Sequence, residues 1–263
     1  MKLGNRSMIT ILEALFRKQH WKAAANMFSV YDDTIDAYSR YLFARGAYPV
    51  SISLTTPLGK VGPTLYSHHD MLTVNEIFCR QDYAASASDR IVVDFGSNIG
   101  ISALYFLTRD DTSFVYCYEP LPINCERLKR NLAKFRGRYQ LAECAVALEN
   151  GTAQFGYEPS GRYGGVGKNT GSTIMVECRS ATSILGGILK DHEEVDVLKI
   201  DIETLERELL LSIPESLLGR IKKIYIEQRF SNNPLVHTHS FRQYGAVAQF
   251  FRPTFDPSRL IAS

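Results

Sequence analysis

The stretch IVVDFGSNIG, residues 91–100, decides the fold of this chain. It begins with an unbroken apolar run, which is typical of a strand buried on both faces. Asp94 and Gly96 follow this run, and Gly100 precedes a second apolar run. Glycine lets the backbone turn tightly and lets a ligand come close. The stretch therefore predicts a buried strand, a tight turn that can receive a ligand, and a helix over residues 99–108.

Outward from this turn, the chain alternates apolar runs with amphipathic stretches. The predicted strands are residues 91–93, 114–118, 139–145, 195–200 and 221–226. The clearest amphipathic helix covers residues 121–135. Alternation of this kind predicts a parallel sheet with helices on both faces. We therefore expect an α/β fold, a doubly wound Rossmann-like sheet, over residues 89–263.

Residues 1–88 have a different texture, with two predicted helices and two short β-like runs. These elements are residues 7–28, 34–44, 50–55 and 61–66. We expect this part to form an N-terminal α+β cap region, with helices and a β-hairpin. Residues 156–171 contain six glycines and no apolar periodicity, which predicts a loop, either a plain surface loop or a mobile lid.

The bulk composition narrows the classes of partner. Lys plus Arg number 30 and Asp plus Glu number 28, which gives a net charge of +2. Such a balance provides no broad basic surface, so we expect no nucleic-acid partner. Five cysteines lack a C-x-x-C pair, which favours a reducing compartment, and we expect a cytoplasmic location. Residues 8–16 are too short to span a bilayer, so we expect no transmembrane segment. The oligomeric state is left open.

Acidic residues follow several predicted strands, where ligands of open parallel sheets bind. Glu119 ends the second strand, and there it could accept hydrogen bonds from both hydroxyls of an adenosine ribose. Dinucleotides and S-adenosylmethionine both carry that diol. A dinucleotide motif starting at Gly96 would need glycine at positions occupied by Asn98 and Ile101. S-adenosylmethionine has no phosphate, and its ammonium group favours an acid such as Asp94.

Three motifs together resemble the FkbM family of methyltransferases over roughly residues 70–230. They are VVDFGSNIG at 92–100, YEP at 118–120 and DVLKIDIE at 196–203. The resemblance implies a class I methyltransferase fold, S-adenosylmethionine as donor, and a small-molecule or glycan acceptor with a hydroxyl group, such as a sugar, a polyketide or a lipid-linked glycan.

The resemblance also assigns residues to the cofactor. Glu119 would hold the ribose, the backbone at Ala145 and Val146 would border the adenine, and Asp201 would lie where donor and acceptor meet. The turn residues expected to bind the cofactor are Asp94, Gly96, Ser97, Asn98 and Gly100. Thr204 departs from the glycine that is common in the family after the second acid, and residues 181–184 also depart, which leaves the acceptor preference open.

Asp201 and Glu203 are the first candidates for accepting a proton from an alcohol acceptor. His237, with His239 nearby, is a further candidate base after the last predicted strand. Glu203 could equally be a first-turn residue that stabilises a helix dipole. A divalent metal held by Asp201, Glu203 and Glu227 is permitted but not required, so the metal stays open.

Two other functions are compatible with the sequence. One is a non-catalytic module that binds S-adenosylmethionine without an acceptor pocket, which Thr204 leaves open. The other is a nucleotide-dependent oxidoreductase or epimerase, which Asn98 and Ile101 disfavour because they replace glycines of the pyrophosphate loop.

Overall fold

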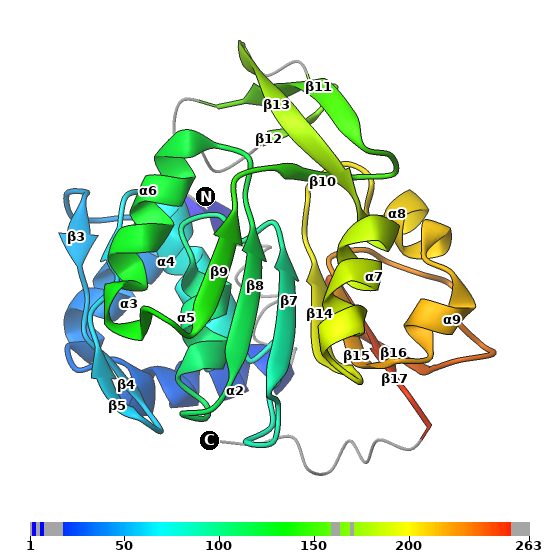
Figure 1. Ribbon diagram of the computed structural model, residues 1–263. Helices are drawn as coiled ribbons and strands as arrows, with labels where there is room; N and C mark the ends of the chain where they lie inside the picture. Colours follow the sequence, from blue (N-terminus) through cyan, green and yellow to red (C-terminus); the bar gives the residue numbers. More distant parts are fainter. Residues whose placement is uncertain (1, 4–5, 8–17, 159–163, 169–170, 254–263) are drawn as a thin grey trace. The chain divides into compact units, whose positions relative to one another are not determined.

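The computed structural model describes residues 2–3, 6–7, 18–158, 164–168 and 171–253 (Figure 1). The chain forms two compact units, Met1–Ala84 and Ala85–Ser263. Each unit is described by itself. The assignment of residues 1–88 as a cap stays a prediction. Within the described residues, no helix is both long and apolar enough to cross a membrane.

The first unit combines helices with short antiparallel strand pairs. Its elements are β1 (Lys2–Leu3), β2 (Arg6–Ser7), α2 (Lys18–Val30), α3 (Thr34–Phe43), β3 (Val50–Ser51), β4 (Leu54–Thr56), β5 (Gly59–Val61), β6 (Thr64–Leu65), α4 (His68–Val74) and the π-helical η1 (Asn75–Cys79). Asp33 caps α3 by accepting a hydrogen bond from the Asp36 amide at 2.9 Å. Residues 8–17 of the predicted first helix lie outside the described residues.

The second unit is built on a seven-stranded sheet. Its strands are β7 (Ile91–Phe95), β8 (Phe114–Tyr118), β9 (Tyr139–Ala142), β14 (Val195–Ile200), β15 (Ile221–Ile226), β16 (Ser240–Tyr244) and β17 (Val247–Phe251). Their order is β16-β17-β15-β14-β7-β8-β9. The five strands from β15 to β9 are parallel, and β17 is antiparallel to β15. This topology confirms the predicted doubly wound sheet of the class I methyltransferase type.

Helices cover both faces of this sheet. They are α5 (Ile101–Leu107), α6 (Pro122–Asn131), the 3₁₀ turn η2 (Ala133–Phe135), α7 (Ala181–Asp191), α8 (Glu206–Ser212) and α9 (Glu215–Leu218). Leu185 of α7 and Leu209 of α8 pack in one core with Val93, Leu198 and Ile224 of the strands. Helix α5 lies on the other face, because its residue Ser102 contacts the β7 side chain Asp94 there.

A second sheet of four strands lies beyond the carboxyl ends of β7, β8 and β9 (Figure 1). Its order is β10-β13-β11-β12, with β10 (Ala145–Ala147), β11 (Gly151–Tyr157), β12 (Gly164–Val166) and β13 (Ser172–Ser180). The prediction of one loop over residues 156–171 is therefore wrong at residues 156–157, which end β11, and at residues 164–166, which pair with β11. Residues 159–163 and 169–170 of that loop lie outside the described residues, so its mobility stays a prediction.

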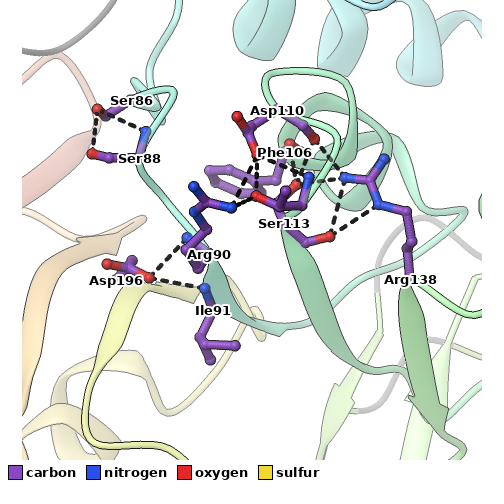
Figure 2. Close-up of polar contacts among 10 residues, drawn as sticks. Ser86, Ser88, Arg90, Ile91, Phe106, Asp110, Ser113, Arg138 and Asp196 are labelled. Carbon is purple, nitrogen blue, oxygen red and sulfur yellow. Dashed lines mark hydrogen bonds and ion pairs between the residues drawn. The ribbon is translucent and has the colours of Figure 1, made fainter.

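Polar contacts fix the amino ends of the central strands (Figure 2). The amides of Arg90 and Ile91 donate to Oδ2 of Asp196 at 2.8 and 2.9 Å, which ties β7 to β14. The Arg138 guanidinium donates to the Ser113 carbonyl oxygen through Nε at 3.2 Å, which ties the start of β9 to β8. These contacts leave the carboxyl edge of the sheet for a ligand.

Candidate active site

The turn between β7 and α5 is closed by hydrogen bonds to β8. The amides of Gly96 and Ser97 donate to the Tyr118 carbonyl oxygen at 3.1 and 3.0 Å. The Ser97 hydroxyl accepts from the Tyr118 amide at 3.1 Å and donates to the Asp94 carbonyl oxygen at 2.9 Å. Ser97 is buried. Its side chain therefore fixes the turn, and a contact with a cofactor stays a prediction.

Gly96 and Gly100 hold backbone conformations that favour glycine, with φ of +80° and +86°. A Cβ on Gly96 would lie 1.8 Å from the carbonyl oxygen of Asp201, and one on Gly100 would lie 2.9 Å from Cγ of Leu128. Asn98 between them has φ of 47°, which asparagine tolerates better than most residues. This tightly packed turn forms a cradle at the sheet edge, and side chains at positions 96 and 100 would collide with the Asp201 backbone and with Leu128.

The Glu119 carboxylate closes the β8 side of this cradle. Its Oε2 accepts from the Asn98 amide at 3.0 Å. Its Oε1 accepts from the Leu121 amide at 3.0 Å and from Nδ2 of Asn124 at 3.2 Å. Burial raises the pKa of Glu119 to about 7, although these hydrogen bonds oppose the rise. A carboxylate offers about four lone-pair positions, so the three donors leave room for a hydroxyl.

Asp94 and Lys199 form a buried ion pair beneath the turn. They are register partners on β7 and β14, with Nζ of Lys199 3.0 Å from Oδ1 of Asp94 and 3.3 Å from Oδ2 of Asp201. Nζ also donates to the Gly96 carbonyl oxygen at 3.0 Å. Oδ2 of Asp94 accepts from the Ser102 hydroxyl at 2.6 Å. Asp94 is 0% exposed, so direct contact with a ligand ammonium stays a prediction.

Lys199 is a site residue that the sequence analysis missed. Burial alone would lower its pKa, but the charges of Asp94 and Asp201 outweigh burial and raise the pKa of Lys199 above its ordinary value. The residue therefore carries its charge inside the sheet. The available signal was a lysine inside an otherwise apolar strand, because a charge at such a position needs a partner.

Asp201 and Glu203 lie just past the end of β14. The Asp201 amide donates to the Phe95 carbonyl oxygen at 3.1 Å, so the strand pairing fixes its backbone. Glu203 has φ of 72°, a conformation that costs energy in a residue other than glycine and that occurs often at functional sites. Burial and then the charge of Asp201 raise the pKa of Glu203, toward the range of a general base.

The second sheet contacts Glu203 and Thr204 through β12 and the turn after it. Nζ of Lys168 lies 3.4 Å from Oε2 of Glu203. A Cβ on Gly165 would lie 2.5 Å from Cγ2 of Thr204. Thr204, which replaces the family's usual glycine, therefore packs against β12. The second sheet forms one wall beside Glu203.

Ala145 and Val146 lie on β10, which pairs with β13 of the second sheet. The Ala145 side chain is buried with Leu121 and Phe155, and the Val146 side chain is buried in the main core. Both side chains are used for packing. Only their backbone is left for an adenine ring, and that contact stays a prediction.

The structure does not bring His237 to the acids. His239 donates from Nε2 to the Ile221 carbonyl oxygen at 3.0 Å, at the amino end of β15. His237 is exposed and lies only two residues earlier in the chain. Asp201 follows the carboxyl end of the neighbouring strand β14. His237 therefore lies toward the opposite edge of the sheet from Asp201.

Glu227 does lie near the carboxyl edge, because its amide donates to the Ile200 carbonyl oxygen at 3.1 Å. Among the residues that the structure describes, however, no three His, Cys, Asp or Glu side chains group so as to hold a metal ion. The geometry therefore gives no support to a metal ion held by Asp201, Glu203 and Glu227. We assign no metal site.

The strand order, the glycine turn and the acid after β8 define a class I methyltransferase domain. The family model for the methyltransferase FkbM domain matches residues 94–252, which is more than half of the chain. The chain therefore belongs to the FkbM methyltransferase family, which confirms the resemblance seen in the sequence.

Two characterised relatives show sequence similarity. Methyltransferase sdnD of Sordaria araneosa is 24% identical over 183 residues, which cover 56% of this chain and 69% of sdnD. AMB antimetabolite synthetase AmbE of Pseudomonas aeruginosa is 22% identical over 193 residues, 59% of this chain. The chain spans only 9% of AmbE. A solved O-methyltransferase family protein from Burkholderia thailandensis is 11% identical, with a TM-score of 0.39, and the match covers 72% of this chain and 57% of that one.

Proposed function

We propose that the protein is an S-adenosylmethionine-dependent O-methyltransferase that acts on a hydroxyl group of a sugar, glycolipid or polyketide-like acceptor. The observation that supports it best is the buried Glu119 carboxylate beside the Gly96 turn. Three N–H donors leave about one acceptor position on this carboxylate, and an ionised carboxylate accepts strongly from a ribose hydroxyl there.

In this proposal, the residues of the turn divide the binding of the donor among them. Glu119 accepts from a ribose hydroxyl. Gly96, Asn98 and Gly100 present backbone to the methionine part, while Ser97 and Asp94 keep the turn in shape from below. The backbone of residues 145–146 borders the adenine. The proposed contacts use polar backbone and carboxylate groups, and they need no pyrophosphate site.

The bound donor would supply a methyl group carried by a sulfonium; the acceptor oxygen would bond to the methyl carbon in line while the carbon–sulfur bond breaks and S-adenosylhomocysteine leaves. The protein must then take the proton from the acceptor hydroxyl. Glu203 is the stronger candidate base, because its pKa is raised and its carboxylate is partly exposed. The Asp201 carboxylate pairs with Lys199. In this proposal it accepts a hydrogen bond from the hydroxyl of the acceptor molecule and so orients that hydroxyl.

The acceptor class is drawn from the family resemblance and from the wall beside Glu203. That wall presents the Lys168 ammonium, which suits a polar, hydroxyl-rich acceptor more than an apolar one. The oxidoreductase alternative is not carried further, because the chain belongs to a methyltransferase family.

Calorimetry tests the donor half of the proposal. S-adenosylhomocysteine and NAD are titrated separately into the protein. We expect a dissociation constant for S-adenosylhomocysteine that is micromolar or lower, on the order of −8 kcal/mol, and no heat of binding for NAD. Binding of NAD alone would refute the donor assignment.

A further inference from the structure

The ammonium of Lys199 lies where the donor side and the acceptor side of the proposed site meet. Four oxygens surround Nζ, and two of them are carboxylate oxygens, from Asp94 at 3.0 Å and Asp201 at 3.3 Å. The other two are the carbonyl oxygens of Gly96 at 3.0 Å and Phe95 at 3.5 Å. A lysine ammonium has three N–H donors. These donors are therefore shared among the backbone of the turn, the Asp94 carboxylate beneath it and the Asp201 carboxylate after β14.

Burial makes this arrangement rigid. The side chains of Lys199 and Asp94 are 2% and 0% exposed, so water cannot replace either partner. Removal of one member of a buried ion pair leaves the other charge without compensation, which is strongly destabilising. Asp201 is different, because its side chain is 26% exposed and reaches the surface of the site. One cation thus connects a fully buried carboxylate to an accessible one.

The backbone reinforces the same connection. The carbonyl oxygen of Asp201 lies against Gly96 so closely that a Cβ there would be 1.8 Å from it. The Asp201 amide donates to the Phe95 carbonyl oxygen at 3.1 Å. The positions of the turn and of Asp201 are therefore coupled, and Lys199 bonds to both.

We propose that Lys199 is a positioning residue, whose buried ammonium holds the Phe95–Gly96 backbone and the Asp201 carboxylate in the one arrangement that binds the methyl donor productively. This inference about Lys199 rests on the proposed function, because it assumes that the turn receives S-adenosylmethionine. Lys199 touches neither reactant and acts through the groups that it holds.

The chain offers a matched control in Lys223 of β15. Its side chain is also fully buried, and it forms an ion pair with Asp89. Lys223 is the register partner of Val197, nearer the amino end of the sheet than Lys199. A change at Lys223 should therefore lower stability as a change at Lys199 does, without altering the donor turn.

The experiment measures S-adenosylhomocysteine binding by calorimetry, well below each variant's unfolding temperature. The variants are Lys199→Met, Lys223→Met, Asp94→Asn and the double variant Asp94→Asn with Lys199→Met. Comparing Asp94→Asn with the double variant is decisive, because the Asp94 charge is absent from both. The difference in affinity then reports the contacts of Lys199 with the turn and with Asp201.

We expect the double variant to bind about tenfold or more weakly than Asp94→Asn, the loss typical of a charged hydrogen bond. Lys223→Met should bind within about threefold of the parent, because distant sites act independently. Equal affinity of Asp94→Asn and the double variant would overturn the proposal, since Lys199 would then only neutralise Asp94. If the parent itself does not bind S-adenosylhomocysteine, the proposed function fails as well.

Discussion

Replacing Glu119 with glutamine should change how the stability of the protein depends on pH. Burial raises the pKa of this carboxyl group from 4.5 to about 7 in the folded protein. Between these two pH values the folded state holds a proton that the unfolded state has lost. The free energy of unfolding therefore falls as pH rises through this range. The difference of about 2.5 pH units, at about 1.4 kcal/mol each, amounts to roughly 3 kcal/mol.

The assay is urea unfolding of the parent and Glu119→Gln at pH 5 and pH 8. Other titrating groups are the same in both proteins, so the difference between them isolates Glu119. We expect the variant to gain up to about 3 kcal/mol relative to the parent between the two pH values. Glu143→Gln is the control, because Glu143 is an exposed carboxylate just after β9. If the free energies of unfolding of the parent and of Glu119→Gln differed by the same amount at both pH values, the buried, proton-binding state of Glu119 would be refuted.

The same group should make donor binding depend on pH. A ribose hydroxyl donates to the ionised carboxylate, so the affinity for S-adenosylhomocysteine should rise as pH increases through about 7 and level off above it. Glu119→Gln should bind at least about thirtyfold more weakly at pH 8, a loss on the order of 2 kcal/mol. Its affinity should not follow pH in that range. Parental affinity in this variant would remove Glu119 from the donor site.

Three further changes test other parts of the site. Gly96→Ala should destabilise the fold by several kcal/mol, on the order of 3, because its Cβ would meet the Asp201 carbonyl oxygen at 1.8 Å. Gly167→Ala is the control, because Gly167 has φ of +74° but open space around it. In thermal unfolding it should cost only about 1 kcal/mol. Equal losses of stability in the two variants would contradict the close packing of Gly96 against Asp201. Asp201→Asn removes the charge that pairs with Lys199 and should misplace the acceptor hydroxyl, which slows single-turnover methyl transfer about 100-fold while the unfolding temperature stays near that of the parent. A parental rate would exclude its charge from the mechanism. Lys168→Ala should raise the pKa of Glu203 and move the acidic limb of the pH–rate profile to higher pH, whereas an unmoved limb would argue against Glu203 as the base.

The central strands could be predicted from sequence because they are buried on both faces. The predicted strands at residues 114–118, 195–200 and 221–226 coincide with β8, β14 and β15. Each is rich in apolar and β-branched or aromatic residues and ends near an acid, although β14 and β15 each carry two charged residues. Parallel strands then bring those ends to one edge, so the sequence also indicated where Glu119 and Asp201 would lie.

The second sheet was not predictable in the same way. Strand β12 consists of two glycines and Val166, a composition that resembles a loop. Gly165 is required because Thr204 occupies the space where a side chain would lie. That contact joins residues far apart in the chain, and no local pattern reveals it.

Side-chain direction accounts for the remaining differences at the site. Asp94 belongs to the face of β7 that α5 covers, so its carboxylate meets Ser102 and Lys199 inside the protein. His237 seemed close to the site because it follows β15 in sequence. The chain returns along the sheet before β16, which runs parallel to β15, so His237 lies toward the other edge.

Mass spectrometry of a methyl-transfer reaction tests directly whether the protein transfers a methyl group to a hydroxyl oxygen. The protein is incubated with S-adenosylmethionine that carries a deuterated methyl group, together with a panel of glycans and a cell extract, and Asp201→Asn serves as the control. We expect a labelled product whose fragments place the methyl group on an oxygen. We expect far less of that product from the Asp201→Asn variant than from the parent. A labelled methyl group on nitrogen or carbon, or binding of S-adenosylhomocysteine without any labelled product across the panel and the extract, would contradict it.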